Sequence, residues 1–231
     1  MPHEDKATSL SQGSTLAQAI AHLRRGLCSD GSDAGSGARI GGSSSDPRGE
    51  SFQWKALESW ASDYGLLLPS SFPGPERMGG MEVDVRFDPA DSLWWKYTNP
   101  GFAGFTVEWH PGEPPTLMMA TPLQYLERLE LTNELFAMGI ELRGLWPAPE
   151  GGDWRIVTTQ PDAVGAAATH EDILHGMEAA GWELLPHADV GRRGALSFRQ
   201  GSVALWDAHP ANIVITNDGT LVPIDVILTR V

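Results

Sequence analysis

The sequence predicts an α+β fold built from small antiparallel sheets and a few helices. Two strand patterns, 82–87 and 93–97, follow each other across a short turn. Two later segments, 122–136 and 170–180, begin with capping boxes and are predicted to be helices. Near the C-terminal end, two apolar runs flank Asn217-Asp218-Gly219, which predicts a hairpin.

The first 50 residues are predicted to be a flexible region with one short helix. Residues 1–13 have the composition of a disordered segment. Residues 28–50 are dominated by Ser, Gly and Asp, which is typical of a flexible linker. No strand precedes these glycines and no Gly-Lys-Ser/Thr follows them, so they do not predict a phosphate-binding loop. A helix over 16–27 is predicted by apolar residues at helical spacing, namely Leu16, Ile20, Leu23 and Leu27.

Residues 51–160 are predicted to form the first folded part, in which a small antiparallel sheet dominates. In the strand 82–87, apolar side chains at 83, 85 and 87 alternate with charged ones at 82, 84 and 86. We therefore expect the apolar face to be buried. Thr121 and Gln124 predict the capping box of the helix 122–136. The other predicted elements are a helix at 52–64 and strands at 93–97, 105–109, 116–119, 140–145 and 154–159.

Residues 161–231 are predicted to form the second folded part. Its helix, 170–180, has Thr169 and Asp172 as a capping box and ends at Gly181. The remaining predicted elements are strands at 196–199 and 203–206 and the hairpin 213–224.

Three polar residues in this second part have an informative spacing. Asn212 follows Asp207 by five residues, and Asp225 lies thirteen residues further on, beyond the hairpin. Phosphoryl transfer from ATP needs a carboxylate that orients the acceptor hydroxyl, and an amide oxygen and a carboxylate that hold magnesium. Asp225 lies in the apolar run 222–227, where burying an unpaired carboxylate would be costly and a metal would remove that cost.

These residues carry a resemblance to a known family. Asp-x-His-Pro-x-Asn at 207–212, followed by Ile224-Asp225, resembles the catalytic and metal-binding loops of the protein-kinase-like fold, in the style of aminoglycoside phosphotransferases. More narrowly, the chain resembles the kinase-like domain of polyvalent proteins of phages and mobile elements. The resemblance covers roughly residues 51–231, and its supporting stretches are 94–101, 120–128 and 156–161.

The resemblance implies a two-lobe fold, with a small antiparallel-sheet lobe (51–160) and a truncated large lobe (161–231). It also implies roles for single residues. Asp207 would be the catalytic base, and Asn212 and Asp225 would bind magnesium. Lys96 would pair with the α- and β-phosphates of ATP, and Glu127 would anchor Lys96 from the helix 122–136.

For the nucleotide itself, the resemblance places adenine between the lobes near Gln160. Gly79 and Gly80 would cover the phosphates, because glycine exposes its backbone N–H groups without a blocking Cβ. His209 would shape the catalytic loop by bonding to its backbone, a structural role.

Other interpretations of the same residues stay open. Asp207 and Asn212 also suit ordinary surface loops, since Asp and Asn favour turns. Lys96 also suits the solvent face of a strand, with its stem covering aromatic surface. Glu130 is the second choice for the partner of Lys96, and the glycine pair 79–80 is equally consistent with a simple turn.

The composition excludes several classes of protein. A formal net charge of −14 argues against a nucleic-acid or anionic-membrane surface as the main partner. A single cysteine, Cys28, excludes an internal disulfide and favours a reducing compartment. The sequence shows no apolar run near the roughly 20 residues of a membrane helix, and its first residues do not resemble a secretory signal. We therefore expect a cytoplasmic protein.

The predicted function is an ATP- and magnesium-dependent phosphotransferase that acts on an unknown hydroxyl acceptor, a small molecule or a protein. The alternative is a catalytically inactive nucleotide-binding pseudokinase or interaction module. A weaker alternative is a metal-dependent hydrolase built on Asp207 and Asp225, for which the sequence offers no clear third ligand close by.

Overall fold

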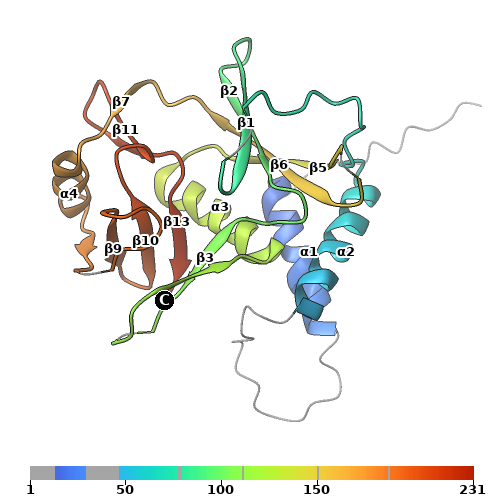
Figure 1. The fold of residues 1–231 in the computed structure, drawn as a ribbon, viewed down its shortest axis with the longest axis horizontal. Helices are drawn as coiled ribbons and strands as arrows, with labels where there is room; N and C mark the ends of the chain where they lie inside the picture. Colours follow the sequence, from blue (N-terminus) through green and yellow to red (C-terminus); the bar gives the residue numbers. More distant parts are fainter. Residues whose placement is uncertain (1–13, 30–46, 78–79, 111, 150, 187) are drawn as a thin grey trace, which may run out of the picture.

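The chain folds into helices and small antiparallel sheets, which confirms the predicted α+β class (Figure 1). The structure is a computed structural model, and it describes residues 14–29, 47–77, 80–110, 112–149, 151–186 and 188–231. Within these ranges it has four helices and four sheets of two to four strands each. In the described ranges, none of the helices is long and apolar enough to cross a membrane.

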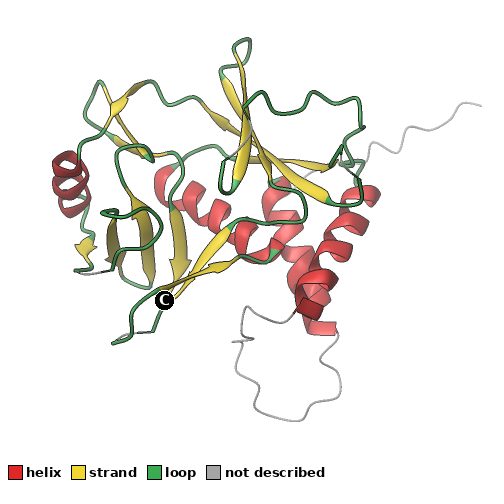
Figure 2. Ribbon diagram, viewed as in Figure 1, coloured by secondary structure: helices red, strands yellow, loops and turns green. Residues whose placement is uncertain are grey.

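The first sheet contains four antiparallel strands in the order β1-β2-β6-β5. Its strands are β1 (Val83–Asp88), β2 (Leu93–Thr98), β5 (Glu141–Pro147) and β6 (Trp154–Pro161). Three helices pack beneath it, as Figure 2 shows: α1 (Thr15–Ser29), α2 (Pro47–Asp63) and α3 (Pro122–Phe136). The capping box predicted at Thr121 and Gln124 is present at the start of α3.

Helix α1 belongs to the core of this part of the molecule. Its side chains Leu16, Ile20 and Leu23 are each only 1% exposed, and they join the same buried cluster as α2, α3 and β5. The helix predicted at 16–27 is therefore present. The predicted boundary at residue 50 falls inside α2, and most of the predicted linker, 30–46, lies outside the described residues.

The later part of the chain forms two more sheets and a helix. One sheet has the order β13-β10-β9-β8, and the other has the order β12-β11-β7. Helix α4 (His170–Ala179) packs against this part and has the predicted capping box at Thr169 and Asp172. The strands are β7 (Gly165–Ala167), β8 (Glu183–Leu184), β9 (Leu196–Gln200), β10 (Val203–Ala208), β11 (Ile213–Thr216), β12 (Leu221–Pro223) and β13 (Ile227–Arg230).

The hairpin of β3 (Phe105–Glu108) and β4 (Thr116–Met119) lies beside β13, and α3 lies between this later part and the pair α1 and α2 (Figure 1). Buried Val107 of β3 joins a cluster that includes Trp206 of β10 and Ile227 of β13. The end of the chain is therefore held by contacts with an element more than a hundred residues earlier.

The burial of β1 is the reverse of the prediction. Asp84 is 3% exposed and forms an ion pair of 2.7 Å with buried Arg155, and Glu82, just before the strand, is buried as well. Val83 and Val85 instead line a cleft. The predicted buried face was wrong because arginines inside the protein pair with the acidic side chains, so the charged face can be the inner one.

Candidate functional site

A cleft of about 380 Å³ lies between the first sheet and the loops around β11 and β12. It brings together residues that are far apart in the sequence, and its volume is in the range typical of small-molecule sites. Its lining residues are Arg77, Val83, Val85, Trp94, Lys96, Gln160, Pro161, Asp162, Ala163, Ala211, Asn212, Val214, Ile224 and Asp225. Four of the predicted site residues are among them: Lys96, Gln160, Asn212 and Asp225.

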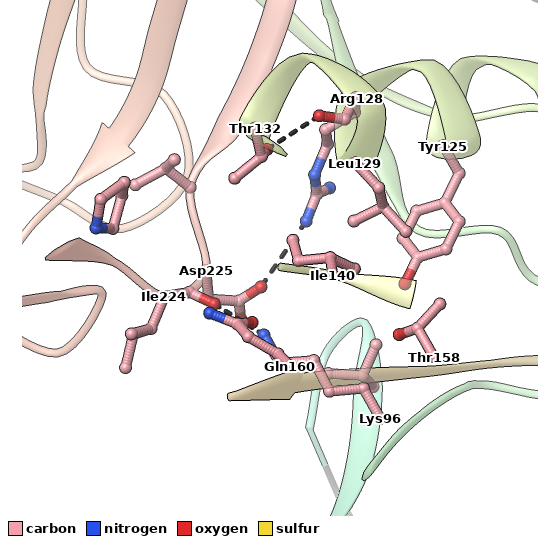
Figure 3. A pocket seen from close by; sticks show the side chains of 13 residues that line it. Lys96, Tyr125, Arg128, Leu129, Thr132, Ile140, Thr158, Gln160, Ile224 and Asp225 are labelled. Atoms are coloured by element: carbon pink, nitrogen blue, oxygen red, sulfur yellow. Dashed lines mark hydrogen bonds and ion pairs between the residues drawn. The ribbon is translucent and has the colours of Figure 1, made fainter. Parts of the chain in front are cut away.

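Lys96 reaches across the cleft rather than into open solvent. Its Nζ donates a hydrogen bond of 2.6 Å to the carbonyl oxygen of Ile224, the residue before Asp225 (Figure 3). Burial lowers the pKa of Lys96, while the nearby Asp225 carboxylate acts in the opposite direction. An ammonium group in this position would gain from a bound anion, because the anion would offset the cost of desolvation.

Asp225 is held at the cleft by a buried arginine that was not predicted. The Nη2 of Arg128 lies 3.6 Å from Asp225 Oδ1, and the same guanidinium forms two hydrogen bonds of 2.5 and 2.9 Å with Glu82. Figure 3 shows Arg128 descending from α3 toward Asp225. The Asp225 side chain is 39% exposed, so it faces the cleft and is not buried in its apolar run.

Burial alone would lower the pKa of Arg128, but the carboxylates of Glu82 and Asp225 raise it, so the guanidinium stays charged. Glu82 is fixed in turn by the N–H of Phe105, which donates to its Oε1 at 2.5 Å. Asp225 therefore faces the cleft beside the Arg128 guanidinium, which is charged whether or not a ligand is bound.

The predicted pair of Lys96 and Glu127 does not form. Glu127 instead pairs with Arg24 of α1 at 2.9 Å, on the surface of the protein. Successive helical residues are rotated by about 100°, and of the neighbours 127 and 128 it is Arg128 that points inward, toward Asp225. A local signal existed: 125, 128, 129 and 132 follow helical spacing, and all four are buried.

Asp207 lies near the end of β10, where the pairing with β9 is irregular, just before the loop of residues 209–212. Its φ angle is 59°, in the left-handed region that Asp and Asn tolerate better than most residues. Its Oδ1 accepts a hydrogen bond of 2.8 Å from the N–H of Arg192, and its Oδ2 accepts one of 3.1 Å from the side-chain amide of Asn212. The predicted base and the predicted metal ligand are thus in direct contact.

His209 shapes this loop, in agreement with its predicted structural role. Its Nδ1 accepts from the N–H of Ala211 at 3.1 Å, and its carbonyl accepts from the N–H of Asn212 at 2.8 Å. The same Asn212 accepts at its own carbonyl from the N–H of Ile224 at 2.8 Å. A short chain of backbone bonds therefore joins the loop of Asp207 to the segment of Asp225.

Burial raises the pKa of Asp207, and the charge of Asp225 adds to this effect. The N–H of Arg192, His209 and the amide of Asn212 act in the opposite direction. A carboxylate with a raised pKa beside hydrogen-bond donors is the environment of a general base.

Gly191 makes room for the Asp207 carboxylate. A Cβ at position 191 would lie 2.3 Å from Asp207 Oδ1, and the φ angle of Gly191 is 79°. Gly194, three residues later, has a similar φ of 81°, but a Cβ there would meet nothing within 4 Å. A side chain at either position would therefore strain the backbone, but only one at Gly191 would also clash with Asp207.

Gly191→Ala is expected to lower the free energy of unfolding by about 1–3 kcal/mol more than Gly194→Ala, because it adds overpacking to a similar backbone strain. Urea-induced unfolding of both variants measures the difference. Equal losses in the two variants would show that Asp207 does not depend on the space left by Gly191.

The predicted glycine pair is only partly described. Gly79 lies outside the described residues. At Gly80 a Cβ would lie 2.0 Å from the carbonyl oxygen of Val83, so glycine is required there by a close approach of the backbone. Gly80 does not line the cleft, and its phosphate-covering role stays a prediction.

Gln160 lines the cleft near the end of β6. The residue is 3% exposed, and among the described residues its Oε1 has no hydrogen-bond partner. Beside it, the indole N–H of Trp94 donates to Asp162 Oδ1 at 2.7 Å. A buried amide oxygen without a partner in the lining of a cleft calls for an explanation, and a bond to a ligand would supply one.

The described residues contain no group of three or more His, Cys, Asp or Glu side chains that could hold a metal ion by themselves. Asn212 and Asp225 supply one amide and one carboxylate, which suits a magnesium ion that is held together with the phosphates of a ligand. Comparison of the chain with models of protein families, with curated proteins and with solved structures finds no match.

Proposed function

We propose that the chain binds ATP with magnesium in this cleft and transfers the γ-phosphate to a hydroxyl group. The observation that carries the proposal is the meeting of Lys96, Asn212 and Asp225 at one cleft, with Asp207 bonded to Asn212 beside it. In the kinase-like arrangement that the sequence resembles, residues 51–160 correspond to the small lobe and 161–231 to the truncated large lobe. The proposal includes a cytoplasmic location, where ATP is available. The exposed, unpaired thiol of Cys28 agrees with such a reducing compartment.

The lining of the cleft offers both apolar and cationic side chains, which the base and the phosphates of a nucleotide need. Val83, Val85 and Val214 offer apolar surface for a base, and Gln160 lines the same cleft with a buried amide oxygen that has no partner among the described residues. Lys96 and Arg77 are the two cationic side chains among the lining residues. They would offset phosphate charge in a protein of net charge −14.

Each polar group has a distinct task in this mechanism. Magnesium, when bound by Asn212 and Asp225, would neutralise charge on the phosphates. Lys96 would leave the carbonyl of Ile224 and bond to a phosphate oxygen. Asp207, fixed by the N–H of Arg192 and by Asn212, would orient the attacking hydroxyl and receive its proton.

A second candidate function is a module that binds a nucleotide without catalysis. The pairing of Arg128 with Asp225 favours it, because a permanent cation 3.6 Å from the predicted metal ligand weakens its attraction for magnesium. Lys96 also bonds a carbonyl group instead of the carboxylate that the resemblance implies. Transfer of labelled phosphate from ATP separates the two functions, since both include binding.

The first test is ATP binding by calorimetry, with and without magnesium. We expect magnesium-dependent binding by the wild type and a loss of affinity of at least about tenfold in Asp225→Asn, which removes a charged metal ligand. Asp63→Asn, an exposed change at the end of α2, is the control for the loss of one negative charge. The absence of binding by folded wild-type protein would overturn the proposal.

A further inference from the structure

A second cavity, of about 500 Å³, lies against residues 209–211, just after Asp207. Its lining is basic or neutral: Ala167, His170, Arg192, Arg193, His209, Pro210 and Ala211. Ala211 lines both this cavity and the cleft of Lys96 and Asp225, so the two spaces border the same loop. The cavity is therefore placed where a second substrate could approach Asp207.

The cavity is basic in a protein that is strongly acidic overall. Arg192 and Arg193 are exposed, and within the described part of the chain neither guanidinium has a hydrogen bond or an ion pair. No acidic side chain is among the lining residues. Two free guanidinium groups at one opening favour a ligand with a phosphate or a carboxylate, which they can bind with paired hydrogen bonds.

The arginines are carried by a closed turn that is tied to Asp207. The N–H of Ala195 donates to the carbonyl of Arg192 at 2.9 Å, and the ring Nε2 of His170 lies 3.1 Å from the carbonyl of Gly194. The N–H of Arg192 itself donates to Asp207 Oδ1. The backbone that carries the two arginines is therefore fixed relative to the proposed base by direct bonds.

Resting on the proposed function, we propose that the phosphate acceptor is a small hydroxyl compound that carries a phosphate or carboxylate group. Arg192 and Arg193 hold this anionic group, and the hydroxyl of the same molecule lies at Asp207. A small molecule is favoured over a protein because the cavity has the volume of a small-molecule site.

The reaction balances with ATP as the only co-reactant. The acceptor oxygen forms a bond to the γ-phosphorus, and the bond from that phosphorus to the β–γ bridging oxygen breaks. ADP leaves with the electron pair of the broken bond, and the hydroxyl proton passes to Asp207. The arginines take no part in this step, and they bind and orient the acceptor.

The test is a titration of protein with isotopically labelled histidine, followed by NMR at constant pH, because His170 and His209 both line the cavity. The probes are inorganic phosphate, citrate, tetramethylammonium and a serine peptide flanked by glutamates. We expect phosphate, citrate or both to shift the two imidazole signals saturably, while tetramethylammonium has no effect. A response to phosphate indicates that the site binds phosphate groups, and a response to citrate indicates that it binds carboxylate groups.

Two variants decide whether the arginines are responsible. In Arg192→Gln/Arg193→Gln the affinity for the effective anion should fall at least about tenfold, since two charge-assisted contacts are lost. Arg25→Gln/Arg230→Gln removes the same charge elsewhere and should retain the affinity. No saturable shift with either small anion, an equal response in the double variant, or a response to the peptide alone would each overturn the proposal.

No ATP is present in this titration, so its result is independent of nucleotide binding. If the anion binds but ATP does not, the proposed function fails and the anion site stands. If ATP binds with magnesium but the anions do not, the proposed function stands and the acceptor class is wrong.

Discussion

Arg128→Met is expected to lower the free energy of unfolding by about 3–5 kcal/mol, because it leaves the buried carboxylate of Glu82 without its partner. The two side chains are only 6% and 11% exposed, and two hydrogen bonds join them. Urea-induced unfolding, followed by the fluorescence of the nine tryptophans, measures the loss.

The neighbouring residue offers a matched control. Glu127→Gln breaks the ion pair with Arg24, whose side chain is 57% exposed, and should change stability by no more than about 1 kcal/mol. Glu82→Gln/Arg128→Met should recover much of the loss, because the uncharged amide can still accept from the N–H of Phe105. Equal losses in Arg128→Met and Glu127→Gln would contradict the assignment of 128 to the inside.

This ion pair also explains one limit of the sequence-based prediction. The alternation of β1 indicates two different faces, but it does not indicate which face is inside. That choice depends on Arg128, 46 residues after Glu82, and on Arg155, 71 residues after Asp84. Ion pairs between residues so far apart in the sequence leave no pattern within β1 itself. The sequence therefore predicts that the charged face of β1 is exposed to solvent, which is wrong.

Elements with local signals were predicted well, whereas those held only by distant partners were missed. Helices α3 and α4 have capping boxes that are readable in the sequence, and both begin where they were predicted to begin. Strand β13 was not predicted, because it is short and its partner β10 lies more than twenty residues earlier. In the site, Asp207, Asn212 and Asp225 have a readable spacing, whereas the tertiary fold brings Arg77 to the cleft and Arg128 to Asp225 from distant parts of the chain.

Asp207→Asn is expected to reduce phosphate transfer by about 10²–10⁴-fold, the usual contribution of a positioned base. Asn is the better test than Ala because the φ angle of 59° suits Asn, and the amide oxygen can still accept from the N–H of Arg192. Transfer of labelled phosphate to the acceptor, at saturating ATP and magnesium, measures the loss.

Asp218→Asn, at the exposed tip of the β11–β12 hairpin, is the control for the same chemical change away from the cleft. Its transfer rate should match that of the wild type. A wild-type rate in Asp207→Asn would instead show that this carboxylate is not the base, and would favour a nucleotide-binding role for the cleft.

The pH dependence gives a second, independent readout of Asp207. Burial raises its pKa, so the transfer rate, which needs the ionised carboxylate, should fall with decreasing pH at values above the ordinary range of an aspartate. Stability should respond in the opposite sense, because a raised pKa means that the folded protein binds this proton more tightly than the unfolded chain does. Ionisation of Asp207 therefore costs stability as pH rises, and Asp207→Asn should remove that cost at neutral pH. An acidic limb that persists in the residual rate of Asp207→Asn would assign the titration to another group.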